Sequence, residues 1–352
     1  MLKYKQSMKP LLIGTALLVV MVTSYSVMSP NQVAKMIPDP AKADPLEPFL
    51  RTGENGYQNN THYESVIKRG AFIHSQEAIQ KRRRDRISEV CERYPMTSQD
   101  DVINKPPFNI IVDHDHKLLF CFIPKVACTS WKRIFLVLKG VISRTDDINQ
   151  FEINHREQRN LNFFSRQSRR MRERILRSYT KIMFARHPMS RVLSAYKNKL
   201  APDTTFNRAR RWQKTIGEGI FEHFHPDSTN NDYSLTFADF VKFLGEEGNL
   251  RGKDDKHWME MYKMCSPCGI NYDIIGKFET MSTDAEFVLE SLSLSDAVEF
   301  PSSTGSSPTN SSDYVIPYYA QLPDDDVMKL YERYRLDFEL FGYDIPHEIH
   351  AT

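Results

Sequence analysis

The sequence predicts an α/β fold in which a central parallel sheet is flanked by helices. Two segments of the same plan indicate this fold: short apolar runs at 118–123 and 181–185 each end at a basic residue and continue into a segment of helical periodicity. The chain has 352 residues, of which 40% are hydrophobic, so it can bury one large core once its N-terminal region is set aside.

The first predicted element is a membrane-spanning helix over residues 11–28. Lysines at 3, 5 and 9 precede this apolar run and no basic residue follows it until Lys35, so residues 1–10 are predicted to be a cytosolic tail. At 1.5 Å per residue the run spans about 27 Å, which suits a thin bilayer. A cleaved signal peptide is the alternative, because Val27 to Ser29 resembles a cleavage site, but an uncleaved type II anchor is favoured.

Residues 29–75 are predicted to form a stem, and residues 76–352 a single luminal domain. The content of Pro, Ala, Asp, Gly and Asn is high up to about residue 60, and the periodicity there is weak. Sequons at Asn59 and Asn310 would lie on the luminal side of the membrane, where N-glycosylation is possible.

The run 118–123 predicts a buried strand that leads into an anion-binding loop. Pro124 ends the hydrogen-bonding ladder because it has no N–H, and Lys125 follows at the carboxyl end of the strand. A helix that begins at Cys128 or Thr129 would direct its free N–H groups and the positive end of its dipole at the same place. The segment therefore predicts a phosphate or sulfate site, and the alternative is an ordinary strand–helix connection with a solvated lysine.

The run 181–185 repeats this plan and adds an arginine. Arg186 falls at the end of the strand, Pro188 is suited to open a helix, and Ser194 lies about two turns further on. An arginine fork with a hydroxyl makes a phosphate clamp. Together with the lysine loop on a neighbouring strand, it would hold a nucleotide phosphorylated at both ends.

These two segments resemble the two cofactor motifs of Golgi carbohydrate sulfotransferases, and are most similar to the chondroitin and dermatan 4-O-sulfotransferases. The likeness continues through His257-Trp258, residues 265–268, residues 272–280 and the closing residues 330–343, and it departs from the family at Ser130 and His187. It implies a P-loop-like sulfotransferase fold with a single luminal domain behind the transmembrane helix.

The resemblance implies 3′-phosphoadenosine 5′-phosphosulfate (PAPS) as the sulfate-donor cosubstrate, with no metal. The first motif would bind the 5′-phosphosulfate and the second the 3′-phosphate. The residues implied in cofactor binding are Pro124, Lys125, Val126, Ala127, Cys128, Thr129, Ser130, Trp131, Arg186 and Ser194.

The implied reaction transfers a sulfuryl group to a sugar hydroxyl of a glycosaminoglycan or a glycoprotein glycan, with position 4 of N-acetylgalactosamine in chondroitin or dermatan favoured. Another sugar, such as terminal glucuronic acid, is an alternative acceptor. Lys125 would act in catalysis by neutralising the leaving phosphate. His155, between the two motifs, resembles the histidine that the wider family places beside the transferring sulfur, and Glu152 is the alternative base.

Two other classes of protein compete with this reading. A nucleoside-triphosphate kinase of related fold should carry Gly-x-x-x-x-Gly-Lys-Ser/Thr, but residues 124–130 contain no glycine. A membrane-anchored glycan-binding protein without turnover could keep the basic grooves. The formal net charge is +2 and the basic runs lack aromatic interleaving, so no nucleic-acid partner is expected. The partners expected are a glycan and the Golgi membrane, and the oligomeric state stays open.

The five cysteines fit an oxidising compartment loosely, since an odd number leaves at least one without an internal partner. Cys121 is expected to be an inert core thiol. For the pair Cys265 and Cys268, a local or longer-range disulfide is favoured over a metal site, and the pairing is left open.

The remaining segments are expected to supply packing and acceptor surface. Helical spacing predicts that five apolar residues of 237–244 belong to the core, and core packing is favoured over sugar stacking for Trp258. Residues 302–312 predict a flexible loop. The apolar stripe of residues 330–341 predicts a C-terminal helix packed on the sheet.

Overall fold

The structure is a computed structural model that describes residues 56–228, 233–246, 255–301 and 312–344. Contacts divide the chain into two units, residues 1–64 and residues 65–352, and the second holds the α/β domain. The predicted tail 1–10, the anchor 11–28 and the loop 302–311 lie outside the described residues. None of the helices in the described ranges combines the length and the hydropathy that a bilayer crossing requires.

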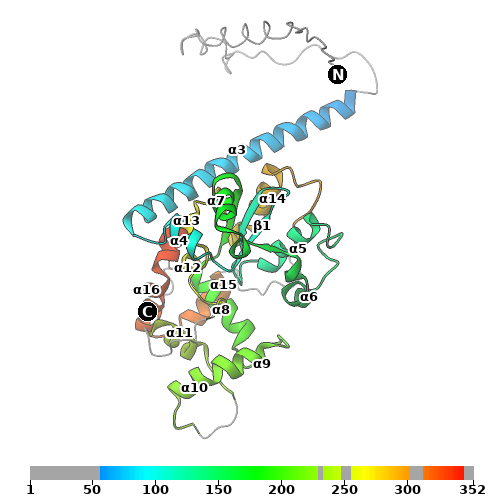
Figure 1. Ribbon diagram of the computed structural model, residues 1–352. Helices are drawn as coiled ribbons and strands as arrows, with labels where there is room; N and C mark the ends of the chain where they lie inside the picture. Colours follow the sequence, from blue (N-terminus) through cyan, green and yellow to red (C-terminus); the bar gives the residue numbers. More distant parts are fainter. Residues whose placement is uncertain (1–55, 229–232, 247–254, 302–311, 345–352) are drawn as a thin grey trace, which may run out of the picture. The chain divides into compact units, whose positions relative to one another are not determined.

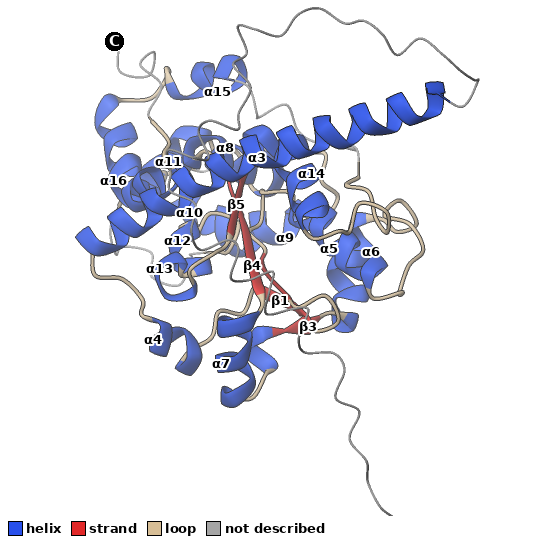
Figure 2. Ribbon diagram, turned by 90° about the horizontal axis from the view of Figure 1, so that it is seen from above, coloured by secondary structure: helices blue, strands red, loops and turns tan. Residues whose placement is uncertain are grey.

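A mixed five-stranded sheet forms the centre of the domain, in the order β3-β1-β2-β4-β5 (Figures 1 and 2). The strands are β1 (Ile110–Asp113), β2 (Leu118–Cys121), β3 (Asn162–Phe163), β4 (Thr180–Ala185) and β5 (Ile274–Lys277). β2, β4 and β5 are parallel, as predicted, whereas β1 is antiparallel to both β2 and β3. The predicted parallel arrangement is therefore confirmed for β2, β4 and β5, but β1 runs in the opposite direction and makes the sheet mixed.

The antiparallel pairing follows from the short connection between β1 and β2. The Asp113 carboxylate accepts hydrogen bonds from the backbone N–H groups of Asp115 and His116, at 2.9 and 3.2 Å, and Lys117 takes a positive φ of 54°. A turn of this length reverses the chain, whereas a parallel pair needs a crossover of a dozen or more residues.

Helices surround the sheet. They are α3 (Gly56–Arg93), α4 (Gln99–Asn104), α5 (Cys128–Leu138), α6 (Gln150–His155), α7 (Arg169–Ser178), α8 (Pro188–Lys199), α9 (Ala209–Trp212), α10 (Glu218–Phe224), α11 (Phe237–Gly245), α12 (Met261–Cys265), α13 (Pro267–Ile270), α14 (Met281–Ser291), α15 (Ser312–Tyr319) and α16 (Asp324–Phe341). Single turns lie at Glu157–Asn160, Phe164–Arg166, Gln213–Gly217 and Phe278–Thr280.

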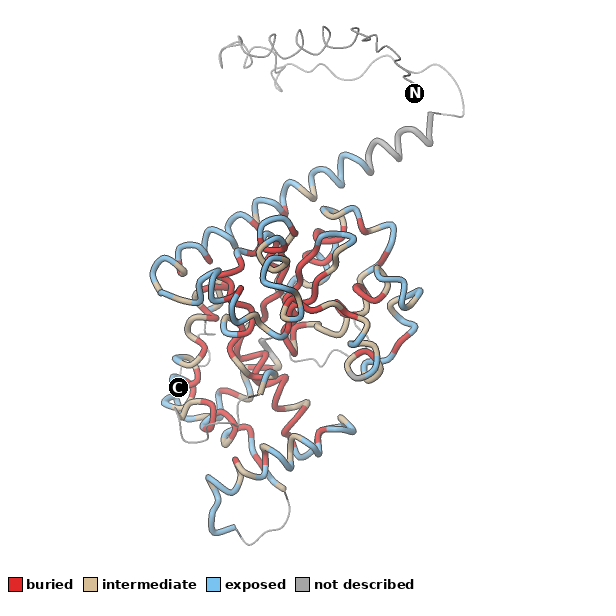
Figure 3. The backbone as a smooth tube through the Cα atoms, viewed as in Figure 1, coloured by how far each residue is buried: buried red, intermediate tan, exposed pale blue. Residues whose placement is uncertain are grey.

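Both faces of the sheet are covered, because successive side chains of a strand point to opposite sides. Phe120 of β2 packs against Trp131 of α5, with ring centroids 5.2 Å apart, whereas the adjacent Cys121 bonds to Cys265 of α12. Figure 2 shows α5 and α12 on opposite sides of the strands accordingly. The strands are buried along nearly their whole length (Figure 3), as expected for a sheet between two helical layers.

A second core lies among helices outside the sheet. All five apolar residues predicted in 237–244 are buried there, which confirms that prediction, and Trp258 is buried against Phe240 at 5.3 Å. α16 contributes Leu330, Tyr334 and Phe338 to this core, and only its last residues reach the core of the sheet. The prediction that the C-terminal helix packs on the sheet is therefore wrong for most of its length, because α11 supplies the apolar surface that its stripe covers.

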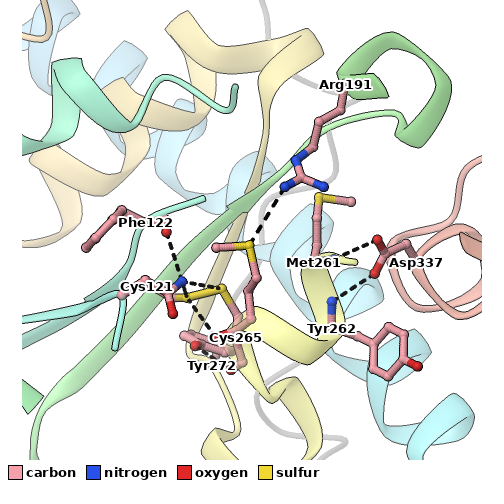
Figure 4. The surroundings of a disulfide bond; sticks show 10 residues. Cys121, Phe122, Arg191, Met261, Tyr262, Cys265, Tyr272 and Asp337 are labelled. Atoms are coloured by element: carbon pink, nitrogen blue, oxygen red, sulfur yellow. Dashed lines mark hydrogen bonds between the residues drawn. A yellow bond between two sulfur atoms is a disulfide. The ribbon is translucent and has the colours of Figure 1, made fainter. Parts of the chain in front are cut away.

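Two disulfides cross-link distant parts of the chain, Cys91 to Cys268 and Cys121 to Cys265. Cys128 keeps a free thiol. A longer-range pairing for Cys265 and Cys268 is thus confirmed, but Cys121 is not the free core thiol that was expected. Figure 4 shows the second bond, which joins the end of β2 to α12.

The helix α3 begins inside the segment predicted as stem and ends beside the sheet. In its second half, Gln80 accepts a hydrogen bond from the backbone N–H of Ile275 in β5, at 2.8 Å. Arg83 forms an ion pair with the buried Asp284 of α14, also at 2.8 Å. These contacts attach the C-terminal half of α3 to the edge of the sheet that β5 forms.

Candidate active site

The two predicted anion-binding segments lie side by side. β2 leads into α5 and β4 leads into α8, as predicted, and the strands pair in parallel with Cys121 opposite Met183. Their carboxyl ends therefore meet at the same edge of the sheet, where ligands of α/β proteins commonly bind. α5 begins at Cys128, one of the two predicted positions, and Pro188 occupies the first turn of α8.

The lysine loop, residues 124–127, has an unusual backbone. Lys125 and Ala127 both take left-handed conformations, with φ of 71° and 49°, while Val126 between them does not. The first helical hydrogen bond runs from the N–H of Trp131 to the carbonyl of Ala127. The N–H groups of residues 128–130 thus stand at the positive end of α5 beside Lys125, in the arrangement that binds phosphate or sulfate oxygens.

Two arginines of the second segment hold the lysine loop in place. Arg186 donates to the carbonyl of Lys125 at 2.8 Å, and Arg191 donates to the carbonyl of Pro124 at 3.1 Å. Both side chains are at most 2% exposed. Burial lowers the pKa of Arg186 to about 10, and that of Arg191 is also lowered by burial. The sequence predicted that Arg186 binds a phosphate of the ligand, but it predicted no role for Arg191.

Further cations gather around the start of α5. Burial, followed by the charges of Arg186 and Lys199, lowers the pKa of Lys125 to about 7. Burial also lowers the pKa of Lys199, the last residue of α8, to about 8, and lowers that of Lys132, which lies 4.2 Å from the centre of the Phe122 ring. Burial is the largest cause of the lowered pKa of all three lysines, because an ammonium group is disfavoured away from water. The cluster is suited to a ligand with several negative charges.

The other residues of the predicted cofactor set divide into two groups. Val126, Trp131 and Ser194 are buried, and Trp131 packs against Phe184 of β4 with ring centroids 4.9 Å apart. The Trp131 contact fixes α5 on the sheet. Pro124 is also buried, whereas Ala127, Cys128, Thr129 and Ser130 are partly exposed beside the loop.

A polar cluster lies on the other side of Arg186. Its guanidinium lies 4.1 Å from the centre of the Phe278 ring. Glu279 accepts a hydrogen bond from the backbone N–H of His187 and another from the Tyr343 hydroxyl, both at 2.8 Å. The His187 ring contacts the Asp344 carbonyl at 2.9 Å, and burial lowers its pKa. His187, where the chain departs from the family pattern, is thus part of the packing beneath the site.

The two residues considered as general base lie on α6. Glu152 accepts a hydrogen bond from the backbone N–H of Asn149 at 3.3 Å and completes a capping box at the start of this helix. His155 is the last residue of α6. α6 is linked to the site through Asn154, whose side-chain oxygen accepts a hydrogen bond from Lys132 at 2.9 Å.

A histidine–aspartate pair beside the lysine loop was not identified from the sequence. The His257 ring hydrogen-bonds through Nδ1 to the Asp255 carboxylate, and the Asp255 carboxylate also accepts from the Trp212 indole at 3.4 Å. Arg191 connects this segment to the loop, because the same guanidinium also binds the carbonyls of Lys256 and Met259, at 3.0 and 2.7 Å. Only the two-residue spacing could have suggested the pair, and that spacing is common.

Within the described ranges, no group of three or more His, Cys, Asp or Glu side chains is arranged to hold a metal ion. Cys265 and Cys268 are both consumed in disulfides and cannot supply thiolates.

Comparison with known proteins gives the same family for most of the domain. Residues 108–344 match the model of the sulfotransferase family. The chain is 31% identical over 274 residues to carbohydrate sulfotransferase 11 of Danio rerio, covering 76% of this chain and 77% of that protein. It is 33% identical over 243 residues to carbohydrate sulfotransferase 14 of Danio rerio, covering 68% and 63% of the two chains. It is 30% identical over 310 residues to carbohydrate sulfotransferase 12 of Xenopus laevis, covering 79% and 71%. No solved structure matches the chain.

Proposed function

Because this chain belongs to the sulfotransferase family, we propose that it is an enzyme that transfers a sulfuryl group from PAPS to a sugar hydroxyl of a glycan. The acceptor proposed is a glycosaminoglycan or a glycoprotein glycan. Position 4 of N-acetylgalactosamine in chondroitin or dermatan is favoured, since the two motifs are most similar to those of the 4-O-sulfotransferases.

The observation that carries this proposal is the convergence of cations on the lysine loop. PAPS bears a phosphosulfate at one end of its ribose and a phosphate at the other. Burial lowers the pKa of Lys125, Lys132 and Lys199, and these cations lie around the N-terminus of α5, whose positive dipole end also favours an anion. The chemistry of these residues fits the donor.

Each part of the site has a distinct role in the proposed reaction. The N–H groups at the start of α5 and the Lys125 ammonium would bind the 5′-phosphosulfate, and Lys125 would stabilise the charge that develops on the leaving phosphate oxygen. Arg186 and Ser194 are proposed for the 3′-phosphate. Arg186 and Arg191 also fix the loop through its carbonyls, so they hold Lys125 in position.

We propose further that the protein is a single-pass type II protein of the Golgi membrane, with residues 1–10 cytosolic, 11–28 spanning the membrane and 29–75 forming a stem. The lysines on only one side of the apolar run support this orientation. N-glycosylation is proposed at Asn59 and Asn310. A glycan-binding protein without turnover remains the competing function.

The decisive experiment measures transfer of labelled sulfate. The full chain, solubilised in detergent, is incubated with labelled PAPS and either chondroitin, desulfated dermatan or a glycan ending in glucuronic acid, and the labelled disaccharides are identified. Label at position 4 of N-acetylgalactosamine supports the proposal, and label only on glucuronic acid would change the acceptor. Glycan binding with no transfer to any acceptor would show a binding protein instead.

A further inference from the structure

We propose that His257, positioned by Asp255, removes the proton from the acceptor hydroxyl. This inference rests on the proposed function and names a residue for its proton-transfer step. His155 and Glu152 were the bases expected from sequence position and family resemblance.

The His257 ring is held in one orientation. Asp255 bonds to its Nδ1 and, through the same oxygen, to the His257 backbone N–H at 2.9 Å. The Trp212 indole contacts the ring edge to face with centroids 5.4 Å apart and donates to the other oxygen of Asp255. These contacts hold the ring in place, so little reorientation is needed before it can accept a proton.

The hydrogen bond to Asp255 also fixes which ring nitrogen can accept a proton. Although burial opposes ionisation, the hydrogen bonds from His257 hold the pKa of Asp255 at about 2, so this carboxylate only accepts hydrogen bonds. The proton of the neutral imidazole must therefore sit on Nδ1, which leaves the lone pair on Nε2. Among the described residues no hydrogen bond occupies Nε2, and the side chain keeps 12% of its surface exposed.

His257 also lies close to the lysine loop, where the donor is proposed to bind. Arg191 binds the carbonyl of Pro124, next to Lys125, and the carbonyls of Lys256 and Met259, which flank His257. One buried guanidinium thus fixes the histidine segment against the lysine loop.

Burial and the neighbouring charges keep the His257 ring in its neutral form. Burial lowers its pKa to about 4, and the charges of Lys199 and Lys125 act in the same direction while Asp255 opposes them. The imidazole is therefore neutral near pH 7 before a ligand binds. An anionic donor bound at Lys125 and Lys199 would offset their charge and raise the basicity of His257 when the acceptor is to be deprotonated.

In the proposed step, the acceptor oxygen forms a bond to sulfur while its proton passes to Nε2 of His257. The bond between sulfur and the bridging phosphate oxygen breaks, and its electron pair stays on that oxygen beside Lys125. The products are the sulfate ester, adenosine 3′,5′-bisphosphate and an imidazolium stabilised by Asp255, which then releases its proton to solvent.

The test compares His257→Asn with a matched control in the full chain. His116→Asn is the control, because its Nδ1 also bonds to an aspartate, Asp113 at 2.8 Å, but it lies at the opposite end of β2 from the lysine loop. His257→Asn should lower kcat by roughly 10² to 10⁴, while binding of adenosine 3′,5′-bisphosphate stays within about twofold. The control His116→Asn should keep the wild-type kcat and the wild-type affinity for adenosine 3′,5′-bisphosphate.

Three further measurements separate a base from a packing residue. The acidic limb of the pH profile of kcat/KM should disappear in His257→Asn, and added imidazole should restore part of the rate of His257→Ala. Asp255→Asn should lower kcat by a factor close to that of His257→Asn, because an amide can donate to Nδ1 and favour the tautomer whose proton occupies Nε2. Restoration by imidazole also shows that the variant is folded.

The inference is overturned if His257→Asn keeps its turnover and its acidic limb, or if turnover is lost in His155→Ala alone. In either case the wild-type protein still transfers sulfate, so the proposed function stands. If the wild-type protein binds no adenosine 3′,5′-bisphosphate and transfers nothing, the proposed function itself fails, and the role of His257 fails with it.

Discussion

Lys125 is proposed to bind an anion, and without that anion its buried charge destabilises the folded protein. Its side chain is only partly exposed, its φ is positive, and its neighbours Arg186 and Lys199 are also cations. Such strain persists at functional sites because the surrounding structure enforces it. Both the rate of transfer and the stability of the free protein should therefore respond when Lys125 is replaced.

We expect Lys125→Ala to lower the rate on the order of 10² to 10³, the effect of losing one charge-stabilising donor. Arg186→Ala should raise KM for PAPS more than it lowers kcat, because a fork that binds ground state and transition state alike is lost. Steady-state kinetics with PAPS varied tests both, and Arg177→Ala, at the exposed end of α7, is the control. Wild-type kinetics in both site variants would show that the donor binds elsewhere.

We also expect Lys125→Met to raise the thermal unfolding midpoint of the ligand-free protein at pH 7. Lysine is protonated below about 10.4 in an unfolded chain, whereas its pKa in the folded protein is about 7. Between these values the unfolded state binds more protons, so this group makes stability rise with pH. The gain from Lys125→Met should be largest at and below pH 7 and should vanish near pH 10. Calorimetry from pH 6 to 10 measures it, and an equal shift at every pH would contradict the charge explanation.

The elements show which parts of the fold the sequence specifies locally. The units β2–α5 and β4–α8 were predictable, because an apolar run, a proline and a helical stripe lie within about 20 residues of one another. The antiparallel β1 was not predicted, since the hairpin turn after Asp113 lacks the Asn-Gly or Asp-Gly signal of a tight hairpin. The packing of α16 against α11 was not predicted for another reason. An amphipathic stripe shows that one face of a helix is buried, but it does not show which element packs on that face.

The disulfide pairs depend on which helices and strands lie next to each other, so identifying the pairs tests the fold directly. Alkylation of the denatured, unreduced protein should label one cysteine, Cys128, and peptide mapping should find the pairs 91–268 and 121–265. The double variant Cys121→Ser/Cys265→Ser should lose about 2–5 kcal/mol in free energy of unfolding, since a long loop is released.

The control for this experiment is Cys128→Ser, which should unfold at the same denaturant concentration as the wild type. Label on Cys121, or a bond between Cys265 and Cys268, would contradict the arrangement of β2 against α12.

At the scale of the whole molecule, the site depends on segments far apart in the sequence. The pairing of Lys125 with Arg186 could be predicted, because both follow strands of one sheet. The positions of His257 and Lys199 beside the loop could not be predicted. Lys199 is brought there by α8 and the segment of His257 by the contacts of Arg191, and no local sequence pattern encodes either. Sequence position and family resemblance therefore directed attention to His155.

The charge distribution around residues 11–28 predicts the orientation of the chain in a membrane. Because lysines flank only the N-terminal side of residues 11–28, we expect residues beyond about 30 to be protected when sealed microsomes are treated with protease. An epitope before residue 10 should be removed, and detergent should abolish the protection of the rest. Complete digestion in sealed vesicles would rule out a type II anchor.

The two disulfides also set an order of events in biosynthesis. Each joins a cysteine made early to one made late, and 144 residues separate Cys121 from Cys265. At about 5–20 residues per second, the ribosome needs on the order of 10 s to add that stretch. Meanwhile Cys91 and Cys121 lack their native partners and Cys128 has none, so a premature bond among these three is the mispairing expected in the nascent chain. An oxidoreductase that delays or reverses that bond should raise the yield of active protein, and replacing Cys128 by serine should lessen the need for it.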